Sequence, residues 1–440
     1  MKQYPTYKES GVQWIGQIPE HWNVCHLWWL LEHMTTGLNP RDNFKFKEDG
    51  EYFYVTIANF KDGQLFLDEK CDRIDKDAWN IIQERSDLQK GDILFASISR
   101  NGQAYIVNEF PANWNINESV FKLRFMKNVV DTNFAYYVLT DDSFYNEMQS
   151  EATGATFQSI KQNKLKLNTL PLPPFAEQQA IAKFLDFKTA KIDETISLYE
   201  QQKADLVEYR KALISDTVTR GLNPNVPLKD SGIQWLGQIP EGWKIVPLKF
   251  LLASGMMYGA NESADEPNME WPRYIRITDI AENGSLKDET YMSLSPDKAA
   301  DYMLQKGDIL FARSGATVGK TYMFNENYPA CFAGYLIKAT CGKDLLPEFL
   351  LKYTQSSVYE NWKNSIYIQS TIQNIGADKY NQMPIPVPSL AEQQAIVSFL
   401  DSKTAMIDEA IRRIDEQIAD LKAYRTALIT DAVTGKIDVR

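Results

Sequence analysis

Two tandem copies of one sequence unit make up this chain, and that repetition constrains its fold more than any other feature. Three phrases recur in the same order, at offsets of 221, 216 and 215 residues. They are SGVQWIGQIPEHW at 10–22 and SGIQWLGQIPEGW at 231–243, KGDILFA at 90–96 and 306–312, and AEQQAI at 176–181 and 391–396. Solenoid repeats have periods of about 20 to 50 residues, so these spacings indicate a duplicated domain.

Each copy begins with a globule of mixed character. Runs such as YFYVTIANF at 52–60 and RYIRITDI at 273–280 predict strands between DG or NG turns, and NFAYYVLTDDSFYNEM at 133–148 is compatible with helix. LPLPPF at 170–175 and MPIPVPSL at 383–390 end each globule, because proline breaks helices. We therefore expect an α+β protein with two pseudo-repeated mixed α/β globules.

A long helix with heptad periodicity is expected after each proline-rich stretch. The predicted seam residues are Ile192, Tyr199, Leu206 and Leu213 in the first helix and Ile407, Ile411, Ile414, Ile418, Leu421 and Leu428 in the second. From 176 to 217 the helix would run about 60 Å. A lone helix of this kind is unstable in water, so we expect an antiparallel coiled coil with the globules at opposite ends. The alternative is a helix that lies over its own globule.

These patterns divide the chain into four predicted segments. They are the first globule at 1–174, the first long helix at 175–218, the second globule at 219–388, and the second helix with a C-terminal tail at 389–440.

Net charge and cysteine spacing limit which kinds of nucleic-acid surface and metal site this chain can carry. The net charge of −11 and pI of about 5.0 argue against a broad nucleic-acid surface, because Lys and Arg supply most nonspecific affinity for phosphates. All four segments are mildly acidic, so a DNA surface would have to be local. The cysteines, Cys25, Cys71, Cys331 and Cys341, show no CxxC spacing, and we expect free thiols and no metal site.

The N-terminal sequence points to a cytoplasmic protein. MKQYPTYKES lacks the apolar core of a signal peptide, and the run LWWLL at 27–31 is too short to span a bilayer.

Several near-motifs favour structure over chemistry. LPPF at 172–175 resembles an amino-methyltransferase motif, but Leu172 cannot accept a hydrogen bond. SGATVGKT at 314–321 has Ser314 where a phosphate-binding loop requires glycine. All three histidines lie in the first copy, so both globules cannot share a histidine-based site.

The duplicated phrases identify a likeness at the level of family. The two SGxQWxGxIPExW openings, the two junctions into AEQQAI, and the endings at 206–224 and 421–440 together resemble the specificity subunit of a type I restriction-modification enzyme. The likeness covers essentially the whole chain. It implies two target-recognition domains, each reading one half of a split DNA sequence, and two long helices that fix the distance between the halves.

The resemblance also implies partners and cofactors. Two methyltransferase subunits that hold S-adenosylmethionine would dock on the helical region and methylate adenine, and restriction subunits that use ATP and Mg would cleave. This chain is then expected to be non-catalytic, to bind double-stranded DNA, and to hold no cofactor or metal.

Candidate DNA-binding residues lie in two places in each globule. The loops after KGDILFA differ between copies, as expected for different half-sites, and nominate Arg100, Asn101, Gln103, Arg313, Ser314 and Lys320. The strings TFQSI and TIQNI are shared and nominate Thr156, Gln158, Thr371 and Gln373. Arg suits guanine, and Gln or Asn suits adenine. The alternative roles are a solvated loop and a strand cap.

Two other functions compete. A protein-binding scaffold would explain the coiled coil and the acidity, but it gives two globules no purpose. A self-sufficient DNA methyltransferase would need cofactor and catalytic motifs that we do not find in the sequence.

Overall fold

The computed structural model describes residues 2–61, 63–97, 103–150, 160–264, 267–281, 284–315, 317–367 and 374–440. The chain forms two compact units. The first consists of Met1–Tyr199 and Glu416–Arg440, and the second of Glu200–Asp415. Both unit boundaries fall within long helices, α6 (Phe175–Arg220) and α11 (Leu390–Val433). Each unit therefore combines one globule with part of both helices, and the four predicted segments remain a separate prediction.

The first globule contains β1 (Tyr7–Glu9), β2 (Gln17–Pro19), β3 (Asn23–His26), α1 (Leu27–Leu30), β4 (Leu31–Thr36), β5 (Tyr52–Val55), β6 (Phe60–Lys61), β7 (Gln64–Leu65), β8 (Arg73–Ile74), α2 (Lys76–Ser86), β9 (Ile93–Ala96), β10 (Ala104–Ile106), β11 (Trp114–Ile116), β12 (Val120–Phe125), α3 (Thr132–Leu139), α4 (Asp142–Ser150), α5 (Gln162–Leu167) and β13 (Thr169–Leu172).

The second globule contains β14 (Leu228–Asp230), β15 (Gln238–Pro240), β16 (Lys244–Pro247), β17 (Met257–Tyr258), β18 (Arg273–Ile275), α7 (Pro296–Ala299), β19 (Ile309–Ala312), β20 (Thr321–Met323), β21 (Ala330–Phe332), β22 (Leu336–Ala339), α8 (Pro347–Thr354), α9 (Ser357–Tyr367), α10 (Ala377–Asn381) and β23 (Pro384–Val387).

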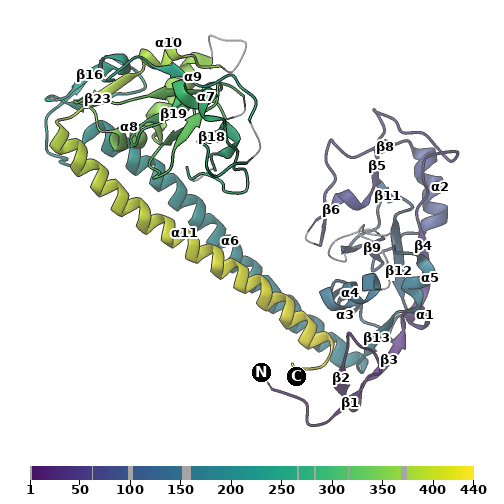
Figure 1. The fold of residues 1–440 in the computed structure, drawn as a ribbon. Coiled ribbons are helices and arrows are strands. Elements are labelled where there is room, and N and C mark those ends of the chain that lie inside the picture. The colour runs from purple at the N-terminus through teal and green to yellow at the C-terminus, as the bar shows by residue number, and fades with distance from the viewer. Residues whose placement is uncertain are drawn as a thin grey trace. The chain divides into compact units, whose positions relative to one another are not determined.

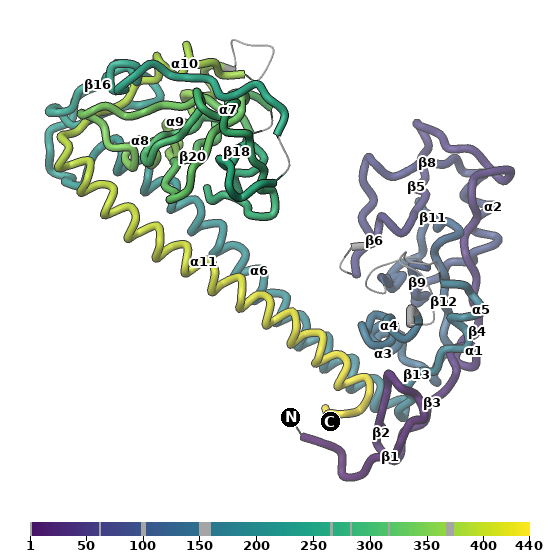
Figure 2. Tube along the Cα trace, in the orientation of Figure 1, coloured from purple at the N-terminus to yellow at the C-terminus, as the bar shows by residue number. Residues whose placement is uncertain are grey.

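The two globules share one sheet topology. The main antiparallel sheet has the order β10-β9-β12-β4 in the first unit and β20-β19-β22-β17 in the second. The register also agrees, because Ala96 faces Val120 and Ala312 faces Leu336. A parallel pair accompanies each sheet, β5 with β11 and β18 with β21. Figure 2 shows β5 beside β11 in the first unit. The predicted fold class, two repeated mixed globules with long helices, is confirmed.

The repeated phrase KGDILFA forms the central strand of each main sheet. All four residues of β9 and of β19 are buried, so the apolar side chains fill both faces of the sheet. In the first unit the run 133–148 forms two helices, α3 and α4, whose side chains pack with Ile93 and Phe95 on one face of the sheet. On the other face, Leu94 packs with Val55 and Ile116 of the parallel pair. The helical run is interrupted between α3 and α4. There the Asp141 carboxylate accepts hydrogen bonds from the backbone N–H groups of Ser143 and Phe144 at the start of α4.

Within each unit, part of α6 lies antiparallel beside part of α11 (Figure 1). In the first unit Arg425 Nε contacts Asp193 Oδ1 at 2.9 Å, and in the second Arg210 Nε contacts Asp408 Oδ1 at 3.1 Å. These are the same pair in the repeated sequence, with the two helices exchanged. The second unit adds Lys203 Nζ to Asp415 Oδ1 at 2.6 Å.

The predicted seam residues point away from solvent. Ile192, Ile407, Ile414, Ile418 and Leu428 are buried. The other five, Tyr199, Leu206, Leu213, Ile411 and Leu421, are partly buried. The alternative of a helix packed on its own globule also holds for part of α6, because Ile181 and Leu185 are fully buried in the first core.

The repeated opening phrase closes the end of a long helix. Trp22 is fully buried against the end of α11 in the first unit, and Trp243 lies at the end of α6 in the second. Each helix ends at a glycine in the left-handed region, Gly435 at φ 75° and Gly221 at φ 75°. A Cβ at Gly435 would touch the Trp22 ring at 3.0 Å, and one at Gly221 would lie 3.2 Å from Trp243.

The connection from helix to opening phrase is made differently in the two units. In the second unit it is continuous chain, residues 221–243. In the first unit the chain termini replace it, because the Asp438 N–H donates to the Lys2 carbonyl at 2.8 Å and the Tyr7 hydroxyl donates to the Lys436 carbonyl at 3.3 Å. The N and C labels accordingly lie close together in Figure 1. Among the described helices, none has the length and apolarity needed to cross a bilayer.

Replacing Gly435 by Ala should destabilise the first unit more than replacing Gly16 by Ala. Both glycines have positive φ, 75° and 69°, which costs an L-residue about 1 to 2 kcal/mol. A Cβ at Gly435 would also collide with Pro19 and Trp22, whereas one at Gly16 would have nothing within 4 Å. Denaturant unfolding of both variants measures the difference, and equal losses would contradict the proposed packing role.

Candidate nucleic-acid interface

The two candidate strings of each globule meet at one end of the main sheet. In the first unit Ile160 is the last residue of TFQSI, and its N–H donates to the Ser97 carbonyl at 2.8 Å just beyond β9. In the second unit the Ile375 N–H, which ends TIQNI, donates to the Arg313 carbonyl at 2.8 Å just beyond β19. Sequence analysis nominated these strings separately, and the fold brings their described ends together in both units.

The backbone around this point is the same in both units. The Ser97 backbone N–H donates to the Ser119 carbonyl at 2.9 Å, and the Arg313 backbone N–H donates to the Tyr335 carbonyl at 3.0 Å. One residue earlier, the Ala96 N–H donates to the Gln103 carbonyl at 2.9 Å, and the equivalent bond from Ala312 to Lys320 measures 2.8 Å. We call this set of backbone hydrogen bonds the shared frame.

The neighbouring strand continues the correspondence. Thr36 of β4 lies opposite Phe121, and Tyr258 of β17 lies opposite Ile337. A glycine follows each of these two residues, Gly37 and Gly259, and a Cβ at either glycine would collide with a backbone carbonyl. The close approach of two strands therefore fixes both positions in the same way.

Three equivalent positions at the shared frame and on the neighbouring strand carry different side chains in the two units. The first unit carries Ser97, Ser119 and Thr36, three small hydroxyl residues. The second unit carries Arg313, Tyr335 and Tyr258 at the same three positions. The Arg313 guanidinium carbon lies 4.9 Å from the centre of the Tyr258 ring, within cation–π range. Tyr335 is 64% exposed and Tyr258 is 41% exposed, so these rings face solvent.

Other predicted residues have different positions. Ser314 forms an isolated antiparallel bridge with Asn374, which directly follows the candidate Gln373. Lys320 Nζ donates to the Ile280 carbonyl at 2.7 Å and so ties its loop to a neighbouring turn. Six candidates lie outside the described residues: Arg100, Asn101, Thr156, Gln158, Thr371 and Gln373.

Sequence analysis missed Tyr258 and Tyr335. A difference between aligned copies was available for Tyr335, which replaces Ser119 just before an equivalent strand. Tyr258 had no such signal, because it reaches the site from a strand more than fifty residues earlier in the chain.

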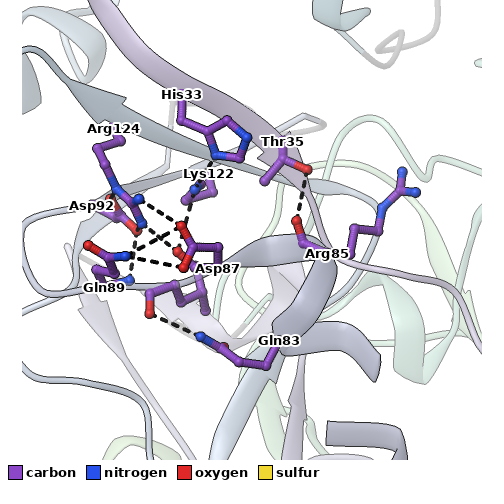
Figure 3. A network of polar contacts seen from close by, with 10 residues as sticks. His33, Thr35, Gln83, Arg85, Asp87, Gln89, Asp92, Lys122 and Arg124 are labelled. Atoms are coloured by element: carbon purple, nitrogen blue, oxygen red, sulfur yellow. Dashed lines mark hydrogen bonds and ion pairs between the residues drawn. The ribbon is translucent and has the colours of Figure 1, made fainter. Parts of the chain in front are cut away.

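A charged network fixes the opposite end of the first sheet (Figure 3). Arg124 of β12 donates from Nε to Asp92 Oδ1 at 2.8 Å and from Nη1 to Asp87 Oδ2 at 2.8 Å. Lys122, whose side chain is fully buried, places Nζ 2.6 Å from His33 Nδ1. Asp92 directly precedes β9 and Ser97 directly follows it, so the network and the shared frame lie at opposite ends of that strand.

The network favours one protonation state of His33. Burial, followed by the charges of Lys122 and Arg124, lowers the pKa of His33 below its ordinary value. A neutral Nδ1 can then accept a hydrogen bond from the Lys122 ammonium. Burial opposes ionisation of Asp87, but hydrogen bonds from Arg124 and Gln89 outweigh it and hold the pKa of Asp87 below its ordinary range.

The shared frame gathers groups suited to recognition. Hydroxyls, a guanidinium and exposed aromatic faces can bind base edges, phosphates or stacked bases. Within the ranges that the structure describes, no group of three or more His, Cys, Asp or Glu side chains is placed to hold a metal ion.

Comparison with known proteins gives a consistent family. The model of the type I restriction modification DNA specificity domain matches residues 19–208 and 240–419. A Methanocaldococcus jannaschii protein described as the specificity subunit of the MjaX type I restriction enzyme is 27% identical, and the match covers 99% of this chain and 98% of that one.

Two solved structures resemble this chain in fold. A chain from a structure on complex assembly and conformational transition of the type I R-M system has a TM-score of 0.73 at 17% identity, covering 96% of this chain and 99% of that one. The HsdS subunit from Thermoanaerobacter tengcongensis has a TM-score of 0.53 at 17% identity, covering 96% and 98%.

Replacing His33 by Gln should flatten the dependence of stability on pH. Because the folded-state pKa of His33 is lowered, the unfolded chain binds a proton that the folded chain rejects as the pH falls below about 6.5. Stability is therefore retained above that pH and lost below it. Unfolding temperatures of the wild type and variant at about pH 5.5 and pH 7.5 measure the effect, and an identical pH dependence would contradict it.

Proposed function

The chain belongs to the family of type I restriction modification DNA specificity domains, and from this premise we propose that each globule reads one half of a split DNA target. The long helices would set the distance between the two halves. The chain would itself be non-catalytic and would direct adenine methylation and ATP-dependent cleavage by partner subunits.

One observation carries this proposal. The two units present different side chains on the same backbone frame, Ser97 in one and Arg313 in the other. A scaffold that binds one ligand twice would have no reason to vary these positions. Two readers of two different half-sites require such variation, because base edges are distinguished by the donors and acceptors that face them.

The proposed partners account for the remaining chemistry. We propose two methyltransferase subunits that bring S-adenosylmethionine and dock on the helical region, and restriction subunits that bring ATP and Mg. The acidic balance of this chain fits that division. Partner subunits would supply much of the phosphate contact, and the globules would supply base readout, which depends on local groups more than on net charge.

The direct test is methylome sequencing of cells that express this chain with a type I methyltransferase subunit. We expect a split motif, methylated on adenine in both halves, which disappears in cells without the chain. A demonstrated complex that produced no chain-dependent methylation would contradict the proposal.

Exchange of one globule should change one half of the target. Replacing residues 1–170 with the corresponding globule of another family member should alter one half-site and preserve the other. The same sequencing measures both halves, and the unexchanged chain is the control. A change in both halves, or in neither, would refute the two-reader model.

Lengthening the helices should lengthen the spacer. Four residues inserted near Gln201 add about 6 Å of helix, which corresponds to one or two base pairs of DNA at about 3.4 Å per pair. A matched insertion near Gln417 of α11 would preserve the pairing of the two helices. An unchanged spacer in an active doubly lengthened protein would exclude the helices as the spacing element.

A further inference from the structure

Both the backbone and the side chain of Arg313 are held in place by contacts. Its backbone N–H donates to the Tyr335 carbonyl at 3.0 Å, and its carbonyl accepts a hydrogen bond from the Ile375 N–H at 2.8 Å. Its guanidinium lies over the Tyr258 ring at 4.9 Å. That ring is fixed in turn, because the Tyr258 hydroxyl accepts the Ala377 N–H at 3.0 Å. The side chain therefore has a defined direction before any ligand arrives.

The described part of the chain offers no acceptor to the Arg313 guanidinium. Its Nε is buried without a partner, and among the described residues no acceptor contacts its guanidinium. Two other arginines of the same unit differ, because their guanidinium groups donate to acceptors, although Arg273 Nε is also buried without a partner. Arg273 donates to the Tyr328 hydroxyl at 3.0 Å and to the Lys287 carbonyl at 2.6 Å, and Arg276 donates to Asp279 at 2.9 Å. A desolvated donor without an acceptor is costly, and an acceptor on a ligand would remove that cost.

The ligand of Arg313 must present acceptors to a planar fork of N–H groups. Within DNA, a phosphate offers such acceptors, and so do O6 and N7 of guanine in the major groove. The comparison of the two units separates these cases. Every half-site has the same phosphates, so a phosphate-binding residue has no reason to differ between two copies of one frame. A base-reading residue does, and the first unit has Ser97 instead.

We propose that Arg313 reads a guanine in the half-site bound by the second unit, with Tyr258 as its positioning residue. The inference rests on the proposed function and identifies the base and the residue that reads it. Tyr335, exposed beside Arg313, borders the same position.

The test replaces Arg313 by Ser, the residue that the first unit carries on the same frame. The full chain is studied in complex with its methyltransferase partner, on a panel of DNA duplexes that vary each target position singly. We expect the preference for guanine at one position of one half-site to fall about 5- to 150-fold, the loss of one bidentate contact, while the other half-site stays unchanged. The globule exchange identifies which half belongs to the second unit.

Lys343→Ser is the matched control. Lys343 is exposed, and its replacement by Ser removes the same charge from the same unit. It follows the far end of β22, whereas Tyr335 precedes that strand. Its replacement should leave the preference at every position intact. If the control reproduced the loss seen with Arg313→Ser, general charge would explain the effect and the proposal would fail.

Other outcomes would also overturn the proposal. An equal loss on all sequences, with the salt dependence reduced by about one ion, would identify a phosphate contact. An unchanged preference in Arg313→Ser, with an intact split motif in the wild type, would refute this inference alone. Absence of any split motif in the wild type would refute the proposed function as well.

Arg313→Lys keeps the test decisive if Arg313→Ser does not assemble. Lysine retains the positive charge but lacks the planar fork that matches guanine. We expect Arg313→Lys to lose the preference for guanine while it keeps its overall affinity. Full retention of the preference would contradict guanine readout by Arg313.

Discussion

Each unit depends on the packing of a tryptophan against the glycine that ends a long helix. Trp22 meets Gly435 in the first unit, and Trp243 meets Gly221 in the second. Glycine is favoured at both positions, because the backbone is left-handed and a Cβ would crowd the indole ring. The opening phrase recurs for this structural reason: two helix ends require two tryptophans. Each contact joins a globule to a helix that began in the other repeat.

The sequence predicted the repeat, the mixed globules and the long helices because each depends on local pattern. It did not predict how the units would be divided. Heptad spacing shows that a helix has an apolar seam, but it does not show which globule also packs on that helix. Ile181 and Ile214 belong to the same helix, yet one is buried in the first core and the other in the second. That assignment follows from tertiary packing.

The candidate site shows the same division between local and distant information. Comparison of the copies was enough to nominate the strings around Ser97 and Arg313, since both directly follow a repeated strand. It could not show that TFQSI and TIQNI end beside them, because hydrogen bonds between distant residues have no sequence signature. It also gave no way to separate Arg313 from Lys320, which is nearby and equally charged. The Lys320 ammonium donates to a backbone carbonyl, whereas no described residue accepts a hydrogen bond from the Arg313 guanidinium.

The shared frame lets one fold present two different sets of side chains, as the proposed reading of two half-sites would require. Its hydrogen bonds join backbone atoms, so they persist whether the residue is Ser97 or Arg313. A change of side chain there alters the groups offered to a ligand without removing a bond that holds the sheet. The charged network of the first unit lies at the other end of the strand, where Arg124 and Asp92 fix the sheet independently. In the first unit the charged contacts that hold the sheet and the side chains proposed for recognition thus lie at opposite ends of one strand, so those side chains can vary while the fold is retained.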